Sequence, residues 1–329
     1  MSLTHPSNRR RFIGAAGALC ATTLPLQVFA QTAPIKLVIS WPAGGLTDSV
    51  ARLLGERIGT LLKRVVIVDN KPGAGGQIGT SQFKGSPPNG DTVLLASLNE
   101  AMLSAITYRK LPYQPLRDLL PVSMVAEFPF VLAVPASGPA NLAEFAAWAR
   151  QHPKDVSIGC AGLGTPSYFH GLLLGTKIGF EANMIPFAGG APLMNAIAGG
   201  QVVAAMNAFG SDMIQMHRSG RIRIIGITGD HRSTHPQFDA VPTFVEAGLP
   251  TIPSGWFGLF LPVGASAATV QLWNQALNDV LATDEVRNRF ADFGLVARGS
   301  SPQVLGDLMR SDTTVWADIV KRNNFEPLS

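Results

Sequence analysis

The feature that most constrains the fold is a regular alternation of short β-branched runs with helical patterns from residue 33 onward. The run from Ile35 to Ser40 precedes a helical pattern over Ser49 to Leu62, and the alternation resumes beyond Asn141. Alternation of this kind is typical of mainly parallel sheets that are covered by helices. We therefore predict an α/β protein. The 329 residues suffice for about two domains that each bury a core.

Two extended apolar segments interrupt this alternation. They are "VSMVAEFPFVLAVP" (122–135) and "PTIPSGWFGLFLPVG" (250–264), and a complete set of α/β units lies between them. A chain that leaves one domain and later returns to it through two such crossings can bend between its domains. We predict that residues 31–130 and 255–329 form domain 1, and that residues 131–254 form domain 2.

The first 30 residues have the composition of an export signal. The stretch "SNRRRFIGAAGALCATTLPLQVFA" has a basic head, an apolar middle and an end of the A-x-A type. We expect cleavage after Ala30 and a periplasmic protein. The run from Arg9 to Ile13 resembles the twin-arginine pattern, although basic heads also serve the general secretory route. The apolar middle is broken by Pro25 and is short for a membrane-spanning helix.

Removal of this segment leaves a nearly neutral chain. The segment holds three arginines and no acidic residue, so the formal net charge falls from +4 to +1. No basic run with interleaved aromatic residues remains, which argues against nucleic acid as a partner. Cys160 is then the single cysteine, so no internal disulfide can form. No H-E-x-x-H or C-x-x-C spacing occurs, and we expect neither a metal nor a cofactor.

Glycine-rich turns follow several predicted strands, at the edge where parallel sheets bind ligands. The turn "WPAGGLTD" (41–48) has two glycines that let a ligand approach the backbone, and a Thr-Asp pair that can cap the next helix. The stretches "GCAGLGTPSYFHG" (159–171) and "IPFAGGAPLMNAIAGGQV" (185–202) are of the same type. An ordinary turn with a helix cap explains each one taken alone. Turns of this type on two sides of a cleft predict a small anionic ligand, because free N–H groups at a helix start favour negative charge.

The residues near these turns lack the patterns of a catalytic site. No G-K-[ST] follows the first turn, so it is not a P-loop, and no G-x-G-x-x-G indicates a dinucleotide. Ser167 stands in T-P-S-Y-F, which lacks the G-x-S-x-G elbow. His170 and Cys160 are of types that more often serve packing in such places. We predict a binding protein and not an enzyme.

Several blocks of the chain, in order and with similar spacing, resemble the substrate-binding proteins of tripartite tricarboxylate transporters, the Bug family of periplasmic receptors. The blocks include "WPAGGLTDSVARLLGERI", "VVIVDNKPGAGGQIGT", "GLGTPSYFHGLLL", "IPFAGGAPLMNAIAGGQV", "VPTFVEAGLP" and "GWFGLFLPVGAS". The resemblance implies an α/β, two-domain Venus flytrap of the type II periplasmic binding protein fold. It also implies one ligand carboxylate held between two loops by backbone amides, hydroxyls and bridging waters.

The resemblance extends to individual ligand-binding residues on both loops. In the first loop they are Ala43, Gly44, Gly45, Thr47 and Asp48, and in the second they are Gly164, Thr165, Pro166 and Ser167. The wall around the far end of the ligand is predicted to contain Ser97, Asn99, Phe187, Gly189, Gly190, Asn207 and Asp212.

Three positions depart from the family pattern. Tyr168 stands where His is common, Ala188 where Lys is common, and Asn207 where Asp is frequent. Asn at 207 removes a negative charge that would attract an ammonium group, so we expect an amino acid ligand to be less favoured. The absence of Lys at 188, together with Phe187, makes an aromatic carboxylate or a dicarboxylate as compatible as a tricarboxylate.

The leading hypothesis is a monomeric receptor that captures a small organic acid and delivers it to the membrane permease subunits of a transporter. A ligand that bridges both domains would favour the closed state of the receptor. Two alternatives stay open. One is a receptor that passes its ligand signal to a two-component sensor, and the other is an exported α/β hydrolase, which needs a triad that the spacing does not provide.

Overall fold

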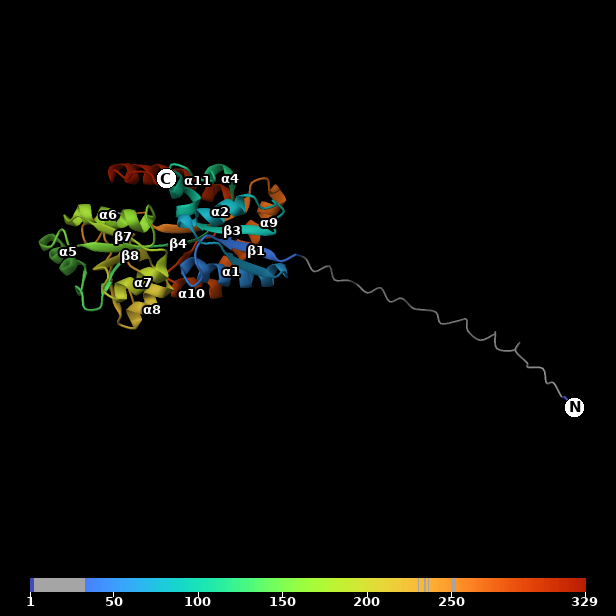
Figure 1. Cartoon of the computed structure of the whole chain (residues 1–329), viewed down its shortest axis with the longest axis horizontal. Coiled ribbons are helices and arrows are strands. Elements are labelled where there is room, and N and C mark those ends of the chain that lie inside the picture. The colour runs from blue at the N-terminus through green and yellow to red at the C-terminus, as the bar shows by residue number, and fades with distance from the viewer. Residues whose placement is uncertain (3–32, 230, 234, 236, 250–252) are drawn as a thin grey trace. The chain divides into compact units, whose positions relative to one another are not determined.

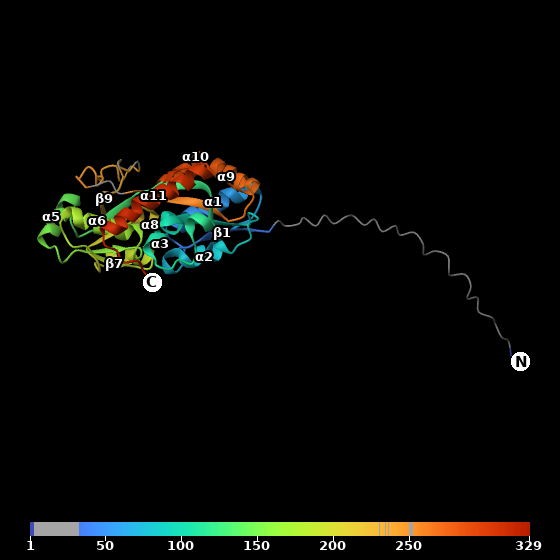
Figure 2. The same ribbon diagram turned by 90° about the horizontal axis from the view of Figure 1, so that it is seen from above.

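The computed structural model describes residues 1–2, 33–229, 231–233, 235, 237–249 and 253–329. The export signal predicted over residues 1–30, with its cleavage site after Ala30, lies outside the described residues except for the first two. Residues 33–329 form one compact unit, in which Figures 1 and 2 show two sheets with helices around them. Among the described helices, none combines the length and the apolar character that a membrane crossing requires.

The first sheet has six strands in the order β11-β4-β10-β3-β1-β2. Their bounds are β1 Ile35–Ile39, β2 Val66–Asn70, β3 Thr92–Ser97, β4 Leu119–Phe128, β10 Gly255–Pro262 and β11 Val296–Ala297. Strand β1 runs parallel to β2 and β3, whereas β10 runs antiparallel to β3 and β4. The predicted parallel pairing therefore holds for the first α/β units. The strands of the two crossings make the sheet mixed, because the chain passes through them in opposite directions.

The second sheet has five strands in the order β7-β6-β8-β5-β9. Their bounds are β5 Phe130–Pro135, β6 Ser157–Cys160, β7 Asn183–Pro186, β8 Ala204–Ala208 and β9 Ile222–Ile227. Strand β6 runs parallel to β7 and β8, and β5 runs antiparallel to β8 and β9. The carboxyl ends of β6 and β8 therefore lie at one edge of this sheet, where loops lead into helices.

Helices pack against both sheets. Around the first sheet they are α1 Leu46–Leu62, α2 Gln77–Lys84, α3 Ser104–Thr107, α4 Pro115–Asp118, α9 Ala267–Leu281, α10 Asp284–Asp292 and α11 Pro302–Arg322, with the short turns η1 Ala74–Gly76 and η2 Asn99–Leu103. Around the second sheet they are α5 Leu142–Gln151, α6 Pro166–Ile178, α7 Gly190–Ala198 and α8 Ser211–Arg218. Side chains of Asn141, Ser266, Thr283 and Ser301 accept the first N–H groups of α5, α9, α10 and α11. Helices α1, α6, α7 and α8 have no such side-chain cap.

The two crossing segments pack closely where the chain passes between the sheets. Only Pro129 separates β4 from β5, so one extended segment takes part in both sheets. Gly255, the first residue of β10, pairs with Phe128 at the end of β4. A Cβ atom at Gly255 would lie 2.1 Å from the Phe128 ring, so only glycine lets the two strands approach this closely. The strands of residues 35–128 and 255–297 thus form one sheet and those of 130–227 the other, while the domain boundaries at 131 and 254 stay a prediction.

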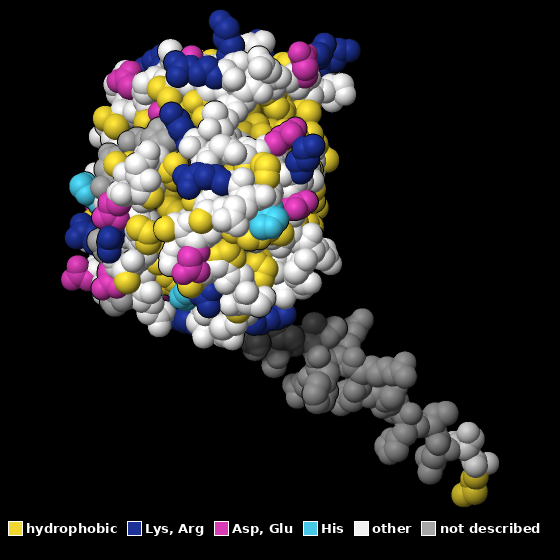
Figure 3. Space-filling model, turned by 90° about the vertical axis from the view of Figure 1, so that its left-hand side faces the viewer, with side chains coloured by type: hydrophobic (Ala, Val, Ile, Leu, Met, Phe, Trp, Pro, Cys, Tyr) yellow, Lys and Arg dark blue, Asp and Glu magenta, His cyan; other side chains and the backbone are white. Residues whose placement is uncertain are grey.

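The surface carries charges of both signs. Figure 3 shows basic and acidic side chains interspersed over the visible face, at the end of the molecule that holds α5. Large exposed apolar side chains such as Val65, Leu116 and Leu272 lie far apart in the sequence, before β2, on α4 and on α9. On this face neither sign of charge forms a continuous field.

His170 of α6 is completely buried beside the crossing segments. Its ring lies 4.3 Å from the Phe130 ring of β5 and 5.6 Å from the Trp316 ring of α11, measured between centroids. Neither ring nitrogen has a hydrogen-bond partner of normal geometry among the described residues. Burial lowers the pKa of His170 from 6.5 to about 3, because the charged imidazolium loses its hydration there. His170 is therefore a neutral packing residue that joins α6 to α11.

We predict that His170 makes the fold acid-sensitive. The unfolded chain binds a proton at His170 below a pH of about 6.5, whereas the folded chain does not until a pH of about 3. The free energy of unfolding should therefore fall with decreasing pH in this window, by at most about 1.4 kcal/mol per pH unit from this residue. Urea unfolding at pH 7 and pH 5 should give a smaller difference for His170→Phe than for the unchanged protein. The exposed His152→Asn serves as control, and an equal pH dependence in all three proteins would contradict the assignment.

Candidate functional site

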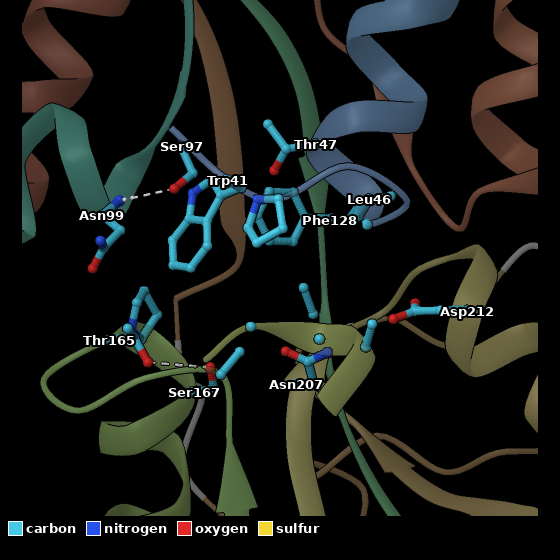
Figure 4. A pocket seen from close by; sticks show the side chains of 18 of the residues that line it. Trp41, Leu46, Thr47, Ser97, Asn99, Phe128, Thr165, Ser167, Asn207 and Asp212 are labelled. Atoms are coloured by element: carbon cyan, nitrogen blue, oxygen red, sulfur yellow. Dashed lines mark hydrogen bonds between the residues drawn. The ribbon is translucent and has the colours of Figure 1, made fainter. Parts of the chain in front are cut away.

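A cavity of about 130 Å³ lies between loops that come from both sheets (Figure 4). Its walls include the turn after β1, the end of β3, the starts of α1, α6, α7 and α8, and the end of β8. Strands β1, β3, β6 and β8 all present their carboxyl ends to it, which is the general location of ligand sites in α/β proteins. The fold thus brings together turns that are far apart in the sequence.

Asp48 holds the first turn in shape. Its carboxylate accepts hydrogen bonds from the Gly44 backbone N–H at 3.0 Å, from Arg52 Nε at 2.9 Å and from Asn70 Nδ2 at 3.0 Å. Asn70 also donates to the Trp41 carbonyl oxygen at 3.2 Å. Burial raises the pKa of Asp48, but the donors from Arg52, Gly44 and Asn70 outweigh it and hold the pKa below the usual range. Asp48 does not line the cavity, so it acts on the loop and not on the cavity's contents.

The first turn of α1 faces the cavity. Helix α1 begins after Gly45 without a side-chain cap, and Gly45, Leu46 and Thr47 all line the cavity. The first N–H groups of any helix have no partner within the helix. Gly44 adopts φ +87°, which glycine tolerates and which turns the chain into the helix. The result is a helix start that offers backbone donors and the Thr47 hydroxyl to the cavity.

The second turn is built in the same way at the start of α6. Thr165 precedes the helix and Pro166 is its first residue. The Thr165 hydroxyl donates to the Gly162 carbonyl oxygen at 2.8 Å and lies 3.3 Å from the Ser167 Oγ. Thr165, Pro166 and Ser167 all line the cavity. This arrangement positions the Ser167 hydroxyl, and Ser167 has no hydrogen bond to His170 that would make a catalytic pair among the described residues.

A third helix start and the end of β3 complete the polar wall. Helix α7 begins at Gly190 after Gly189, which has φ +109°, and both glycines line the cavity. On the opposite side the Ser97 hydroxyl donates to the buried Glu100 carboxylate at 2.6 Å. Burial raises the pKa of Glu100, and Ser97 is its main hydrogen-bond partner. Asn99 donates to the Gly75 carbonyl oxygen at 2.9 Å, so Ser97 and Asn99 are held in place from behind the cavity.

The charge of the lining is unusual for an anion site. No Lys, Arg or His stands among the described residues that line the cavity, and Asp212 is the one ionisable side chain among them. Each helix start carries a partial positive charge of about half an elementary charge, however, and four of them line the cavity, those of α1, α6, α7 and α8. Asp212 itself stands in the first turn of α8. This geometry can hold one carboxylate through neutral donors, as helix starts do elsewhere.

The structure brings most of the predicted residues together. The predicted residues that line the cavity are Ala43, Gly45, Thr47, Ser97, Asn99, Thr165, Pro166, Ser167, Gly189, Gly190, Asn207 and Asp212. Four predicted residues lie outside the lining: Gly44, Asp48, Gly164 and Phe187. Gly44 and Asp48 shape the first turn. Gly164 packs near Phe325, where a Cβ atom would lie 3.2 Å from the ring, and Phe187 packs on the core of the second sheet.

The apolar residues of the lining were not predicted from the sequence. The cavity also contacts Trp41, Leu46, Leu98, Phe128, Phe130 and Phe257. The Phe128 and Phe257 rings are 4.7 Å apart, and they come from the two crossing segments. The stretch "EFPF" lies in one predicted crossing, and its phenylalanines were a usable signal because crossings pass directly behind a cleft between domains.

The family described as "Tripartite tricarboxylate transporter family receptor" matches residues 50–325 of this chain. Protein BugT of Bordetella pertussis is 32% identical over 311 residues, which are 94% of this chain and 93% of BugT. The structure "R. palustris Rpa4515 with adipate" superposes with a TM-score of 0.85 at 27% identity, over 90% of this chain and 98% of that one. The structure "MatC (Rpa3494) from Rhodopseudomonas palustris with bound malate" gives a TM-score of 0.79 at 30% identity, over 87% and 98%.

The chain belongs to the tripartite tricarboxylate transporter receptor family, and the predicted family is confirmed. Its fold is the α/β two-domain Venus flytrap of periplasmic binding proteins, as predicted. The family is one of solute-binding receptors, so the chain is not an enzyme and the hydrolase alternative is dropped. Periplasmic binding proteins make up this family, and its solved relatives named above hold small carboxylates.

We predict that Asp48 contributes to stability through the first turn. Asp48→Ala leaves the Gly44 N–H, Arg52 and Asn70 without their shared acceptor, and charge-assisted hydrogen bonds of this kind are costly to remove. The free energy of unfolding should fall by about 2–4 kcal/mol, which urea unfolding measures.

Asp307→Ala is the matched control for this change. Asp307 also accepts from an arginine, Arg310, but it is exposed on α11, so the substitution should change stability little. An Asp48→Ala protein as stable as the Asp307→Ala protein would show that the turn does not depend on this carboxylate.

Proposed function

We propose that this chain is the periplasmic receptor of a tripartite tricarboxylate-type transporter, and that it captures a small organic carboxylate for the membrane permease subunits. The observation that carries the proposal is the meeting of four uncapped helix starts, those of α1, α6, α7 and α8, at one cavity. Aligned N–H groups and the helix dipole favour an anion there. The hydroxyls of Thr47 and Ser167 add donors from the first and the second sheet.

The size and the lining of the cavity support a small ligand. A cavity of about 130 Å³ suits a compound of low molecular weight. The phenylalanine side chains of the crossings provide an apolar wall for its carbon skeleton. Relatives of the family have been solved with adipate and with malate, which are compounds of this kind.

Binding would drive closure because the donors come from both sides. Thr47 stands on α1 beside the first sheet, and Ser167 stands on α6 beside the second. A carboxylate that bonds to both groups has more contacts when the two sides are close, and a ligand shifts a conformational equilibrium only by such differential affinity. The domain boundaries predicted at 131 and 254 place the bend in the crossing segments. We also propose a monomer that is exported to the periplasm and loses its signal after Ala30.

We predict that small carboxylates stabilise the protein without being consumed. In a thermal-shift screen of malate, adipate, citrate, benzoate and 4-aminobutyrate, at least one compound should raise the Tm. A ligand at one hundred times its Kd adds about 2.7 kcal/mol to the free energy of unfolding. Turnover of a stabilising compound, or no shift from any carboxylate, would defeat the proposal.

The binding of the ligand carboxylate by the two turns is tested with Thr47→Val and Ser167→Ala. Each substitution removes one hydroxyl donor to a charged group, and titration calorimetry should show an affinity for the stabilising compound about tenfold lower or weaker still. Ser311→Ala on the exposed face of α11 serves as control and should bind as the unchanged protein does. Equal affinities in all four proteins would show that the hydroxyls of these two turns do not bind the ligand carboxylate.

A further inference from the structure

We infer that the ligand carries a hydrogen-bond-donating ammonium group at the end opposite its carboxylate, and that Asp212 selects it. The inference rests on the proposed carboxylate receptor and names the class of its ligand: an amino-carboxylate in preference to a dicarboxylate. It assigns to Asp212 a role in specificity. The asparagine at position 207 predicted that an amino group would be less favoured, but in the structure Asp212 supplies a negative charge to the cavity.

Asp212 is placed to receive a cation. It is the one ionisable side chain among the described residues that line the cavity, and it forms no ion pair with any of them. Its Oδ1 accepts from the backbone N–H of Met213 at 2.9 Å. No other hydrogen bond of normal geometry from the described residues reaches the carboxyl group. Burial raises the pKa of Asp212 although the Met213 N–H and the start of α8 favour its carboxylate form, and a bound ammonium group would add an opposite charge beside it.

The backbone leaves room in front of this carboxyl group. A Cβ atom at Gly190 would lie 3.0 Å from Asp212 Oδ2 and 3.5 Å from Asn207 Nδ2. A Cβ atom at Gly210 would lie 3.1 Å from Asp212 Oδ1. Side chains at these two positions would crowd the carboxylate, whereas glycine keeps both oxygens accessible. An ammonium group needs this space, because it places its donors on acceptors within about 3 Å.

The polarity of the cavity matches a zwitterion. Figure 4 shows Asp212 at one end of the cavity and Thr165 at the other, with Ser167 and Asn207 between them. The start of α6, where Thr165 and Ser167 stand, attracts a carboxylate. A dicarboxylate would place its second negative charge beside Asp212 in a site without a basic side chain, and like charges in a partly buried site repel strongly. An amino-carboxylate puts each of its charges against an opposite one.

Pairs of compounds matched in length test the inference on the whole signal-free protein. Glutarate is compared with 4-aminobutyrate, and adipate with 5-aminopentanoate, by titration calorimetry at pH 7. The amino member of at least one pair should bind about tenfold more tightly or better, which is the discrimination that one charge-assisted contact supplies. Asp212→Asn keeps the shape, should weaken the amino member about tenfold, and should leave the dicarboxylate unchanged or tighter. Asp155→Asn, in the exposed turn before β6, is the control.

The outcomes separate the two proposals. Tighter binding of the dicarboxylate in every pair would overturn the inference, because Asp212 would then bind its ligand as a neutral acid, and the carboxylate receptor would stand. Equal discrimination by the Asp212→Asn and unchanged proteins would also overturn it. Failure of every compound in the pairs and of every carboxylate in the wider screen would instead defeat the receptor proposal on which the inference rests.

Discussion

The packing of Phe128 against Gly255 is the constraint on which the rest of the structure depends. These residues stand where the two crossing segments pass between the sheets, and the missing side chain of Gly255 lets β4 and β10 pair there. The pairing fixes the direction in which β5 enters the second sheet, only one residue after β4. It also places the phenylalanines of both crossings on the floor of the cavity. A larger residue at 255 would disturb the connection between the sheets and the site together.

The proposed anion site draws its donors from the backbone of helix starts and not from basic side chains. A lysine or arginine in the cavity would attract any anion over a long range. The partial positive charge of a helix start attracts an anion only within roughly one helical turn, so the helix start must be held close to the ligand. The hydrogen bonds that Asp48 accepts hold the first turn in place, and the hydrogen bond from the Thr165 hydroxyl to the Gly162 carbonyl oxygen holds the second. The described lining has no basic side chain, so Asp212 alone can set which charge is preferred at the end of the ligand opposite its carboxylate.

Sequence reasoning reached the site through residues with strong local signals. Glycines and hydroxyl residues after strands marked the first two turns, and Asp212 was predicted to stand in the wall around the far end of the ligand. It assigned Asp48 and Phe187 to the ligand as well, although Asp48 turns back to its own loop and Phe187 packs on the core of the second sheet. Direction is the reason: a residue next to a ligand in sequence can point to either side of its loop. The apolar lining was not predicted because phenylalanines resemble core residues in sequence, and only their position in a crossing segment distinguishes them.

The sequence alone determined the α/β class and the two crossings, because hydrophobic periodicity is a local property of the chain. It also determined the family, because the blocks that resemble the family can be read in order along the chain. It also predicted an anionic ligand, since helix starts rich in glycine are recognisable wherever they occur. Only the tertiary structure decided that β10 runs between β3 and β4 in the opposite direction and makes the first sheet mixed, and that Asp212 is the one ionisable side chain among the described residues that line the cavity. Both depend on which distant segments meet, and contact between distant segments is settled by packing and not by local pattern.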